Sequence, residues 1–359
     1  MPHKQEDKPA SRNRGMMTVS LRRLLTFTVA ALGGATFLAL HLPLPLLLGP
    51  MLACLVAALM GAPLAGAGQF GIMMRTILGV AVGASITPAV LAGLPDMALS
   101  LAFVPAFIAA IAAIGYPLFR RVFGFDHATA WYGAMPGGLQ DMLVFGEEAG
   151  GDVRALSLIH ATRVLVIVTV APLLMTHYWN VDLSQPPGAP LSSVAPHELL
   201  LMAICGVAGW KIAERIGLFG ASILGPMVLT AALSLSGFIQ HRPPAEMIQA
   251  AQFFIGIAVG SKYAGITARE LHHSVVAGLV YSLALAAISL AFIEIIVHLQ
   301  LAPALDAFLA FLPGGQAEMI VIAIIAGADL AYVVSHHLLR IVLVILLAPI
   351  VARLFRKRG

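Results

Sequence analysis

Long apolar stretches alternate with short polar breaks along the whole chain. The apolar stretches lie near residues 24–41, 44–61, 70–94, 97–119, 126–149, 154–177, 197–213, 217–237, 247–266, 272–299, 304–328 and 329–353. A helix that spans a bilayer needs roughly 20 mostly apolar residues, and from Leu24 to Met74 there is no Asp, Glu, Lys or Arg. The pattern predicts an all-α polytopic membrane protein whose helices are separated by proline, glycine and charge.

Composition supports the same environment. Of 359 residues, 60% are hydrophobic and 11% are charged, whereas soluble domains carry about 25% charged residues. The lipid bilayer is therefore the first expected partner. The basic residues lie in tails and loops, so nucleic acid is not expected as a partner. Cys54 and Cys205 lie in apolar segments, and no metal-binding spacing such as CxxC or HExxH occurs; neither a metal nor another cofactor is expected.

One polar, proline-rich segment divides the chain. It follows Asn180 and contains the run Gln185-Pro-Pro-Gly-Ala-Pro-Leu-Ser-Ser. The expected organisation is a basic cytoplasmic tail, a first membrane unit, a periplasmic linker, a second membrane unit and a short cytoplasmic tail, at residues 1–23, 24–177, 178–196, 197–355 and 356–359.

The two membrane units are related in sequence. Met135-Pro-Gly-Gly recurs as Leu312-Pro-Gly-Gly, and the ungapped alignment that starts at Pro136 and Pro313 gives 12 identities in 37 positions. Leu48-Gly-Pro-Met recurs at 224–227, and the GxxxG pair at 79 and 83 recurs at 256 and 260. Matches at Gly, Pro, Asp, His and Arg are hard to obtain by chance in apolar sequence. They predict an internal duplication, and the GxxxG pairs predict close helix packing.

The distribution of Lys and Arg bears on topology. If segments 126–149 and 304–328 are hairpins that enter and leave on one side, nearly all basic residues fall on the side of the N-terminal tail. By the positive-inside rule this side is cytoplasmic. Each half then has about five transmembrane helices and one broken or re-entrant segment. The halves are therefore expected to be inverted repeats in an inner membrane, with both termini cytoplasmic. Two fully crossing segments are the alternative.

The duplicated Pro-Gly-Gly segments are the first candidate site. Proline and paired glycines break a helix, and a broken backbone at membrane depth must be buried in protein or line a wet cavity. We expect a helix-break cavity, with a tightly packed structural kink as the alternative. The six residues concerned are Pro136, Gly137, Gly138, Pro313, Gly314 and Gly315.

Ionisable residues follow each break. Asp141 and Glu318 lie three positions after the second glycine, and such residues at membrane depth are candidates for binding a proton or sodium ion. The alternative is a permanent salt bridge to the arginine of the next helix.

His160 with Arg163, and His337 with Arg340, repeat with i, i+3 spacing on one helical face. They could form a substrate-anion clamp or a proton relay. Alternatively, the arginines neutralise the two carboxylates and hold the hairpins in place. At the start of the same helices, Asp152 and Asp329 are expected to be N-caps.

The quoted motifs resemble the AbrB family of bacterial inner-membrane proteins from about Leu24 to Leu354. The most specific segments are Met135-Pro-Gly-Gly-Leu-Gln-Asp-Met, the run from Ala149-Gly-Gly-Asp to His160-Ala-Thr-Arg163, and Leu312-Pro-Gly-Gly-Gln-Ala-Glu-Met. The resemblance implies a duplicated membrane unit, and members carry labels such as regulator of gene expression, ammonia monooxygenase or uncharacterised transporter.

The residues favour one of these labels. A monooxygenase needs a redox metal, and no metal-binding cluster is visible, so the protein is not expected to be an enzyme. Direct control of transcription needs a soluble DNA-binding domain, and none is visible either. We expect a secondary transporter of a small-molecule solute, with organic anions as one class, coupled to a proton or sodium gradient. A membrane sensor that affects expression indirectly is the alternative, and a homo-oligomer is left open.

Overall fold

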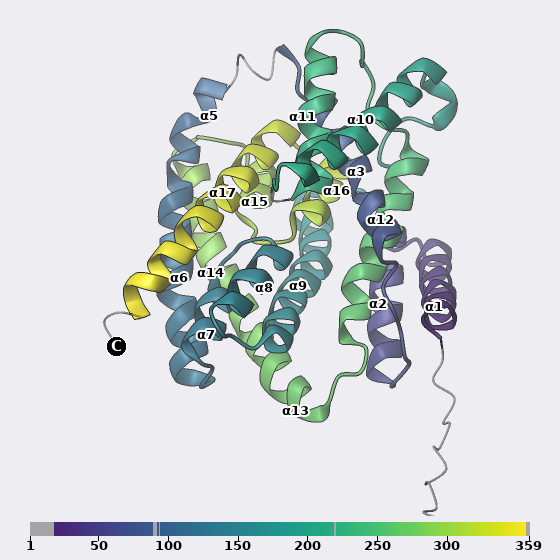
Figure 1. Cartoon of the computed structure of the whole chain (residues 1–359). Coiled ribbons are helices and arrows are strands. Elements are labelled where there is room, and N and C mark those ends of the chain that lie inside the picture. Colours follow the sequence, from purple (N-terminus) through teal and green to yellow (C-terminus); the bar gives the residue numbers. More distant parts are fainter. Residues whose placement is uncertain (1–17, 89–91, 93, 219, 357–359) are drawn as a thin grey trace, which may run out of the picture.

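The regular structure is helical throughout the part of the chain that can be described. The computed structural model describes residues 18–88, 92, 94–218 and 220–356 (Figure 1). Residues 1–17 and 357–359, predicted as tails, lie outside this part. The first helix, α1 (Val19–Ala39), begins before the predicted boundary at Leu24, because Thr18 Oγ1 accepts a hydrogen bond from the N–H of Leu21 and so caps it.

Within the described residues, five helical segments are long and apolar enough to cross a membrane, so the chain is a multi-pass membrane protein. α5 (Leu94–Leu101) continues through α6 (Phe103–Pro117) into a π-helical turn that ends at Val122. Likewise, α13 (Ala268–Glu270) continues through a π-helical turn into α14 (Val276–His298). The five segments are α1, Pro95–Val122, α9 (Val153–Trp179), Ala268–His298 and the first part of α17 (Leu330–Arg356).

Four of the five remaining predicted spans are shorter than expected, and the fifth, 197–213, corresponds to a helix of 20 residues that is not among the five candidate spans. α2 (Pro45–Leu59), α3 (Gln69–Gly83), α11 (Ala221–Leu235) and α12 (Ala245–Gly260) have 15 or 16 residues. At about 1.5 Å per residue they reach about 22–24 Å, less than a bilayer core of about 30 Å. Length and composition therefore support five spans in the described chain, whereas the sequence pattern predicted five in each half.

The connection between the two halves coincides with the predicted linker. α9 ends at Trp179, and α10 (Pro196–Arg215) begins after a single 3-10 turn at Leu191–Ser193. Hydrogen bonds from Ser184 and Gln185 lower the pKa of the exposed Asp182 carboxyl in this loop.

Helices from different halves pack through the GxxxG glycines. A Cβ at Gly79 of α3 would meet the carbonyl oxygen of Ile223 in α11, and one at Gly83 would meet that of Met227. On α12, a Cβ at Gly256 would meet the carbonyl oxygen of Leu47 in α2, and one at Gly260 would meet that of Met51. The glycines thus allow close approach of α3 to α11 and of α12 to α2, as expected.

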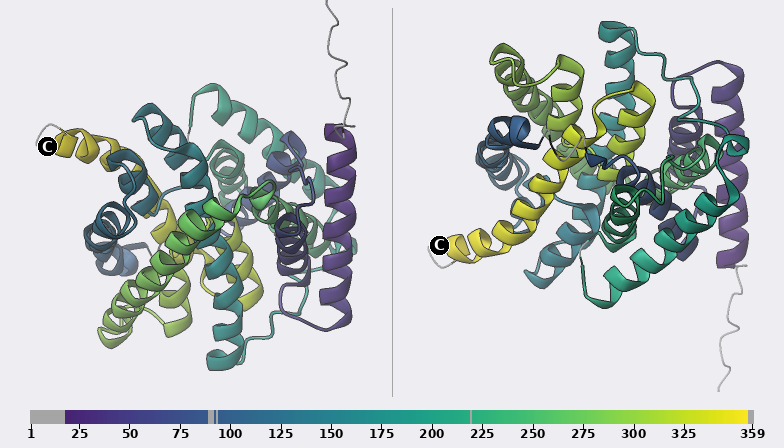
Figure 2. Two further views of the ribbon diagram at one scale, coloured as in Figure 1. Left: turned by 90° about the horizontal axis from the view of Figure 1, so that it is seen from below. Right: turned by 90° about the horizontal axis from the view of Figure 1, so that it is seen from above.

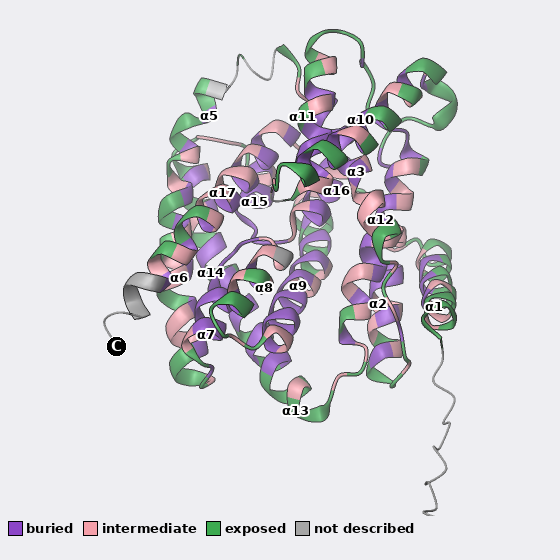
Figure 3. Cartoon of the chain, in the orientation of Figure 1, coloured by how far each residue is buried: buried purple, intermediate pink, exposed green. Residues whose placement is uncertain are grey.

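The second glycine motif packs helices within each half. Gly49 of α2 lies against Gly33 of α1, and Gly225 of α11 lies against Gly209 of α10. α1 lies at one edge of the molecule and the end of α17 at the opposite edge (Figure 2). Among the five long segments α1 is the least buried and α9 the most buried, with α9 running through the interior (Figure 3).

Each Pro-Gly-Gly segment separates two short helices. Segment 126–149 consists of α7 (His127–Ala134) and α8 (Leu139–Glu148), and segment 304–328 consists of α15 (Ala304–Phe311) and α16 (Gln316–Ala326). The residues between the short helices are extended rather than helical, so the backbone groups of each break need partners from elsewhere.

Candidate functional site

A buried arginine holds each break. Arg163 of α9 donates from Nη1 to the carbonyl oxygen of Met135 and from Nη2 to that of Gly137, both at 3.2 Å. Arg340 of α17 does the same to Leu312 (3.0 Å) and Gly314 (3.3 Å). The arginines are 2% and 3% exposed. The guanidinium groups thereby satisfy carbonyls that the helix break leaves without intrahelical partners.

The histidines complete the same pattern one turn earlier. His160 Nε2 lies 3.1 Å from the carbonyl oxygen of Tyr132, and His337 Nε2 lies 2.9 Å from that of Leu309. Each ring therefore donates to the last turn of the short helix before its break. In the second half, Arg340 Nη2 also lies 3.4 Å from His337 Nδ1. The i, i+3 spacing thus places each His and Arg against one hairpin.

The salt bridges to these arginines, the alternative considered for Asp141 and Glu318, are not formed within 4 Å in the described structure. In the described chain, the ion pairs within 4 Å are Arg154–Glu270, Lys211–Glu214 and His241–Glu198. Glu318 instead interacts electrostatically, beyond that distance, with Arg75 of α3 and Arg163 of the opposite half. The arginines thus hold the hairpins by binding backbone carbonyls rather than the carboxylates.

Asp141 and Glu318 fold back over the starts of their own helices. They lie in the first turns of α8 and α16, whose N-cap residues are Gly138 and Gly315 and provide no side-chain cap. A Cβ at Gly138 would meet the Asp141 carboxylate, and one at Gly315 would meet that of Glu318. Free N–H groups and the helix dipole favour negative charge at this position.

The breaks also contact the long helices of the opposite half. A Cβ at Gly137 would lie 3.0 Å from Val344 Cγ1 in α17, and one at Gly314 would lie 3.2 Å from Ile167 Cγ2 in α9. Pro136, Gly137, Pro313 and Gly314 are buried, whereas Gly138 and Gly315 are half-buried. The breaks are therefore packed in this conformation, and the helix-break cavity stays a prediction.

A hollow of the surface lies elsewhere. It is an open, mainly apolar depression at the end of α14, lined by Glu294, Ile295, His298 and Leu299. In the part of the chain that the structure describes, no group of three or more His, Cys, Asp or Glu side chains is arranged to hold a metal ion.

Comparison with known proteins places the chain in a family. The sequence model described as "Transition state regulatory protein AbrB" matches residues 46–356. The chain belongs to the AbrB family. Similar proteins include "Uncharacterized protein YhjN" of Bacillus subtilis (strain 168), 29% identical over 77% of this chain and 76% of the relative. Another is "Putative regulator AbrB" of Escherichia coli (strain K12), 26% identical over 88% and 91%. No solved structure matches.

The two N-cap candidates have the geometry expected from the sequence. Asp152 Oδ1 accepts from the N–H of Ala155, and Asp329 Oδ1 accepts from the N–H of Tyr332, both at 3.0 Å. Sequence reasoning missed a second hydrogen bond at each of these aspartates. The N–H of Asp152 donates to Thr129 Oγ1 (2.8 Å), and that of Asp329 donates to Asp306 Oδ1 (2.9 Å). These bonds join the ends of each hairpin in the AbrB-family chain.

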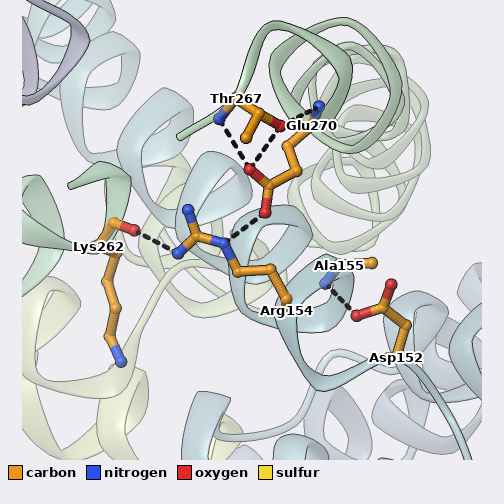
Figure 4. Close-up of polar contacts among 6 residues, drawn as sticks. All are labelled: Asp152, Arg154, Ala155, Lys262, Thr267 and Glu270. Atoms are coloured by element: carbon orange, nitrogen blue, oxygen red, sulfur yellow. Dashed lines mark hydrogen bonds and ion pairs between the residues drawn. The ribbon is translucent and has the colours of Figure 1, made fainter. Parts of the chain in front are cut away.

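A polar cluster at the start of α9 was also missed. Arg154 Nε forms a 2.7 Å ion pair with Glu270 Oε1, and its Nη1 donates to the carbonyl oxygen of Lys262 at 3.4 Å (Figure 4). Glu270 also closes a capping box with Thr267 at the start of α13. The partners belong to different halves of the chain, so no local signal could pair them. In the alignment of the two halves Ala331 stands opposite Arg154, and the tie is therefore one-sided.

Proposed function

We propose that this AbrB-family chain is a secondary transporter of a small solute, with organic anions as the favoured class, driven by a proton or sodium gradient. One observation carries the proposal. Two broken helices, each held by a buried arginine and each followed by a carboxylate at a helix start, contact the long helices of the opposite half. Secondary transporters commonly bind substrate and coupling ion where broken helices meet.

An inverted repeat is part of this proposal. Its support is that contacts recur at aligned positions of the two halves: Arg163 and Arg340 bind carbonyls at equivalent places in the two breaks, and Gly137 and Gly314 face equivalent residues of the opposite half. Five crossings in each half would invert the second half. The short helices α2, α3, α11 and α12, together with the segments that flank them, and α10 would then supply the other five crossings.

We also propose the orientation expected from the sequence, in a bacterial inner membrane with both termini cytoplasmic. The start of α1, α7 and α13 lie at one end of the molecule in Figure 1. Arg120 and Arg121 lie in the π-helical turn that precedes α7 by a short loop, and Arg269 lies in α13. Basic residues at that end support a cytoplasmic assignment for it.

A second candidate is a membrane sensor that affects gene expression through a partner. The name of the Escherichia coli relative, which describes a regulator, favours this alternative. Both candidates share a solute-binding site and differ in whether the solute crosses the membrane. Neither includes a chemical reaction, so we propose no enzymatic activity.

Charge movement in proteoliposomes on a solid-supported membrane tests the proposal. Organic acids, amino acids, ammonium and sodium would be applied at several pH values to the wild type and to the Asp141→Asn, Glu318→Gln double variant. We expect a substrate-triggered current that the double variant loses, because coupling needs the carboxylates. Glu147→Gln with Glu148→Gln, at the exposed end of α8, is the matched control and should keep the current.

The contrary outcome is equally informative. If no solute produces a current and no radiolabelled solute exchanges across the membrane, the transporter proposal fails and the sensor takes its place. An unchanged current in the double variant would remove the carboxylates from the coupling mechanism.

A further inference from the structure

Several buried hydrogen-bond donors on α16 and on the helices that pack against it have no acceptor in the described structure. They are the Nε atoms of Arg163 and Arg340 and the Nε2 atoms of Gln252 and Gln316. Arg163, Gln252 and Arg340 are 2%, 2% and 3% exposed. Buried polar groups in native structures are nearly always paired. A group of unpaired donors therefore indicates a missing acceptor.

These donors come from helices that converge on α16. Arg163 is on α9, Gln252 is on α12 and Arg340 is on α17, and each of these helices packs against α16. Gln316 is the first residue of α16 itself. Arg340 also binds the carbonyl oxygen of Gly314, next to the uncapped N-cap glycine of α16. Arg163, Arg340 and the start of α16 thus belong to one region, and Gln252 comes from a helix that packs against α16.

The charges of this region do not balance. Glu318 interacts electrostatically with Arg75 and Arg163, and Arg163 interacts unfavourably with Arg340. Among the described residues this network has three cations and one buried carboxylate, and the α16 dipole adds partial positive charge. An isolated excess of buried positive charge is unfavourable, so a further anion would bring the region closer to neutrality.

We propose that a small anion bearing a carboxylate binds at the start of α16 between Arg163 and Arg340, and that Glu318 occupies this place while the anion is absent. Each guanidinium has its Nε–H free, and a carboxylate oxygen can accept a charge-assisted hydrogen bond from it. A metal ion would need oxygen acceptors, whereas the unpaired atoms are donors. The region therefore fits the solute rather than a sodium ion.

The proposal predicts competition between Glu318 and the anion. The Glu318 carboxylate folds back over the helix start. A second carboxylate there would be repelled by its negative charge and would overlap with its side chain. Glu318→Gln removes the charge and nearly keeps the shape. It should tighten anion binding even though it abolishes coupled flux, a direction that loss of a merely structural residue would not produce.

The experiment is calorimetric titration of the full chain in lipid nanodiscs with acetate, succinate and citrate, with succinamide as the neutral analogue, at constant pH and ionic strength. We expect at least one carboxylate to bind and succinamide not to bind. Glu318→Gln should bind about tenfold tighter, equivalent to about 1.4 kcal/mol, and Arg340→Gln at least about tenfold weaker. Glu147→Gln should match the wild type.

A second variant that removes a positive charge keeps the test decisive, because Arg340→Gln also removes the hydrogen bond to the Leu312 carbonyl. Arg75 is half-buried, donates no hydrogen bond to either break in the described structure, and interacts with Glu318. Arg75→Gln should weaken binding a few-fold while the protein stays folded. Equal binding of succinamide, weaker binding by Glu318→Gln, or absence of carboxylate binding by the folded wild type would overturn the inference.

The inference rests on the proposed function only for what the bound anion does next. Carboxylate binding without current would keep the anion site and replace the transporter by a sensor. A current with ammonium or a neutral solute, without carboxylate binding, would keep the transporter and remove the anion site.

Discussion

The two hairpins share the same internal contacts but have different surroundings. In both, a histidine of the following helix binds a carbonyl in the short helix before the break, and an arginine binds carbonyls within the break. However, α16 packs against α3, α9, α12 and α17, whereas α8 packs mainly against α7 and α9. Glu318 is consequently 7% exposed, whereas Asp141 is half-buried.

This difference separates contacts that depend on nearby sequence from burial that depends on distant helices. The contacts at the break depend on residues close in sequence to the hairpin, and they are the same in both halves. The burial of α16 depends on helices from both halves, and α8 has no equivalent enclosure. The structure therefore combines one enclosed carboxylate, Glu318, with one half-buried carboxylate, Asp141.

Removal of either arginine should have the largest effect. Arg163→Ala and Arg340→Ala each leave two buried carbonyls without a donor, at about 1–3 kcal/mol for each carbonyl. We expect both variants to lose several degrees of unfolding temperature in detergent and much of the monodisperse fraction, to a similar extent. Exposed Arg121→Ala is the control. A loss confined to one arginine would show that the two breaks are not held equivalently.

Thiol labelling should separate the surroundings of the hairpins. Position 147 in α8 is exposed, and the equivalent position 324 in α16 is 8% exposed. With buried Cys54 and Cys205 replaced by alanine, Glu147→Cys should react with a water-soluble maleimide at least about tenfold faster than Ile324→Cys, because a buried thiol reacts only after local opening. Equal rates would mean that the hairpins exchange environments faster than the labelling.

The one-sided ion pair should have the smallest effect. Glu270→Gln removes a partly exposed tie between α9 and α13, so the free energy of unfolding should fall by less than about 1 kcal/mol. A change of about 1 kcal/mol can shift the equilibrium between the closed structure and its locally opened form about fivefold. The rate at which Ile324→Cys is labelled should therefore rise by up to that factor. Glu214→Gln, which breaks the exposed Lys211 pair inside α10, should leave labelling unchanged.

The sequence predicted features that depend on local chemistry. The helix breaks follow from Pro-Gly-Gly, the caps from Asp152 and Asp329, and the shared face of His160 and Arg163 from their spacing. The GxxxG pairs indicated close packing because only glycine permits a carbonyl of another helix to approach so closely. These effects act within a few residues of the motif.

Features that depend on distant partners were not accessible. An arginine and a carboxylate in neighbouring segments suggested an ion pair, but the guanidinium reaches the unpaired carbonyls first. The role of Arg75 near Glu318 depends on α3 packing against α16. Likewise, the short helices could not be told from full spans, because the apolar composition continues through their connecting segments.

The glycine contacts between α2 and α12 have a consequence for biosynthesis. The backbone around Leu47 meets Gly256, which belongs to the second half and is translated much later. At about 5–20 residues per second, an interval of about 200 residues lasts about 10–40 s. During that time the first half is already in the membrane with the packing face of α2 uncovered. The insertion machinery, a chaperone or lipid must therefore shield this face until the second half arrives.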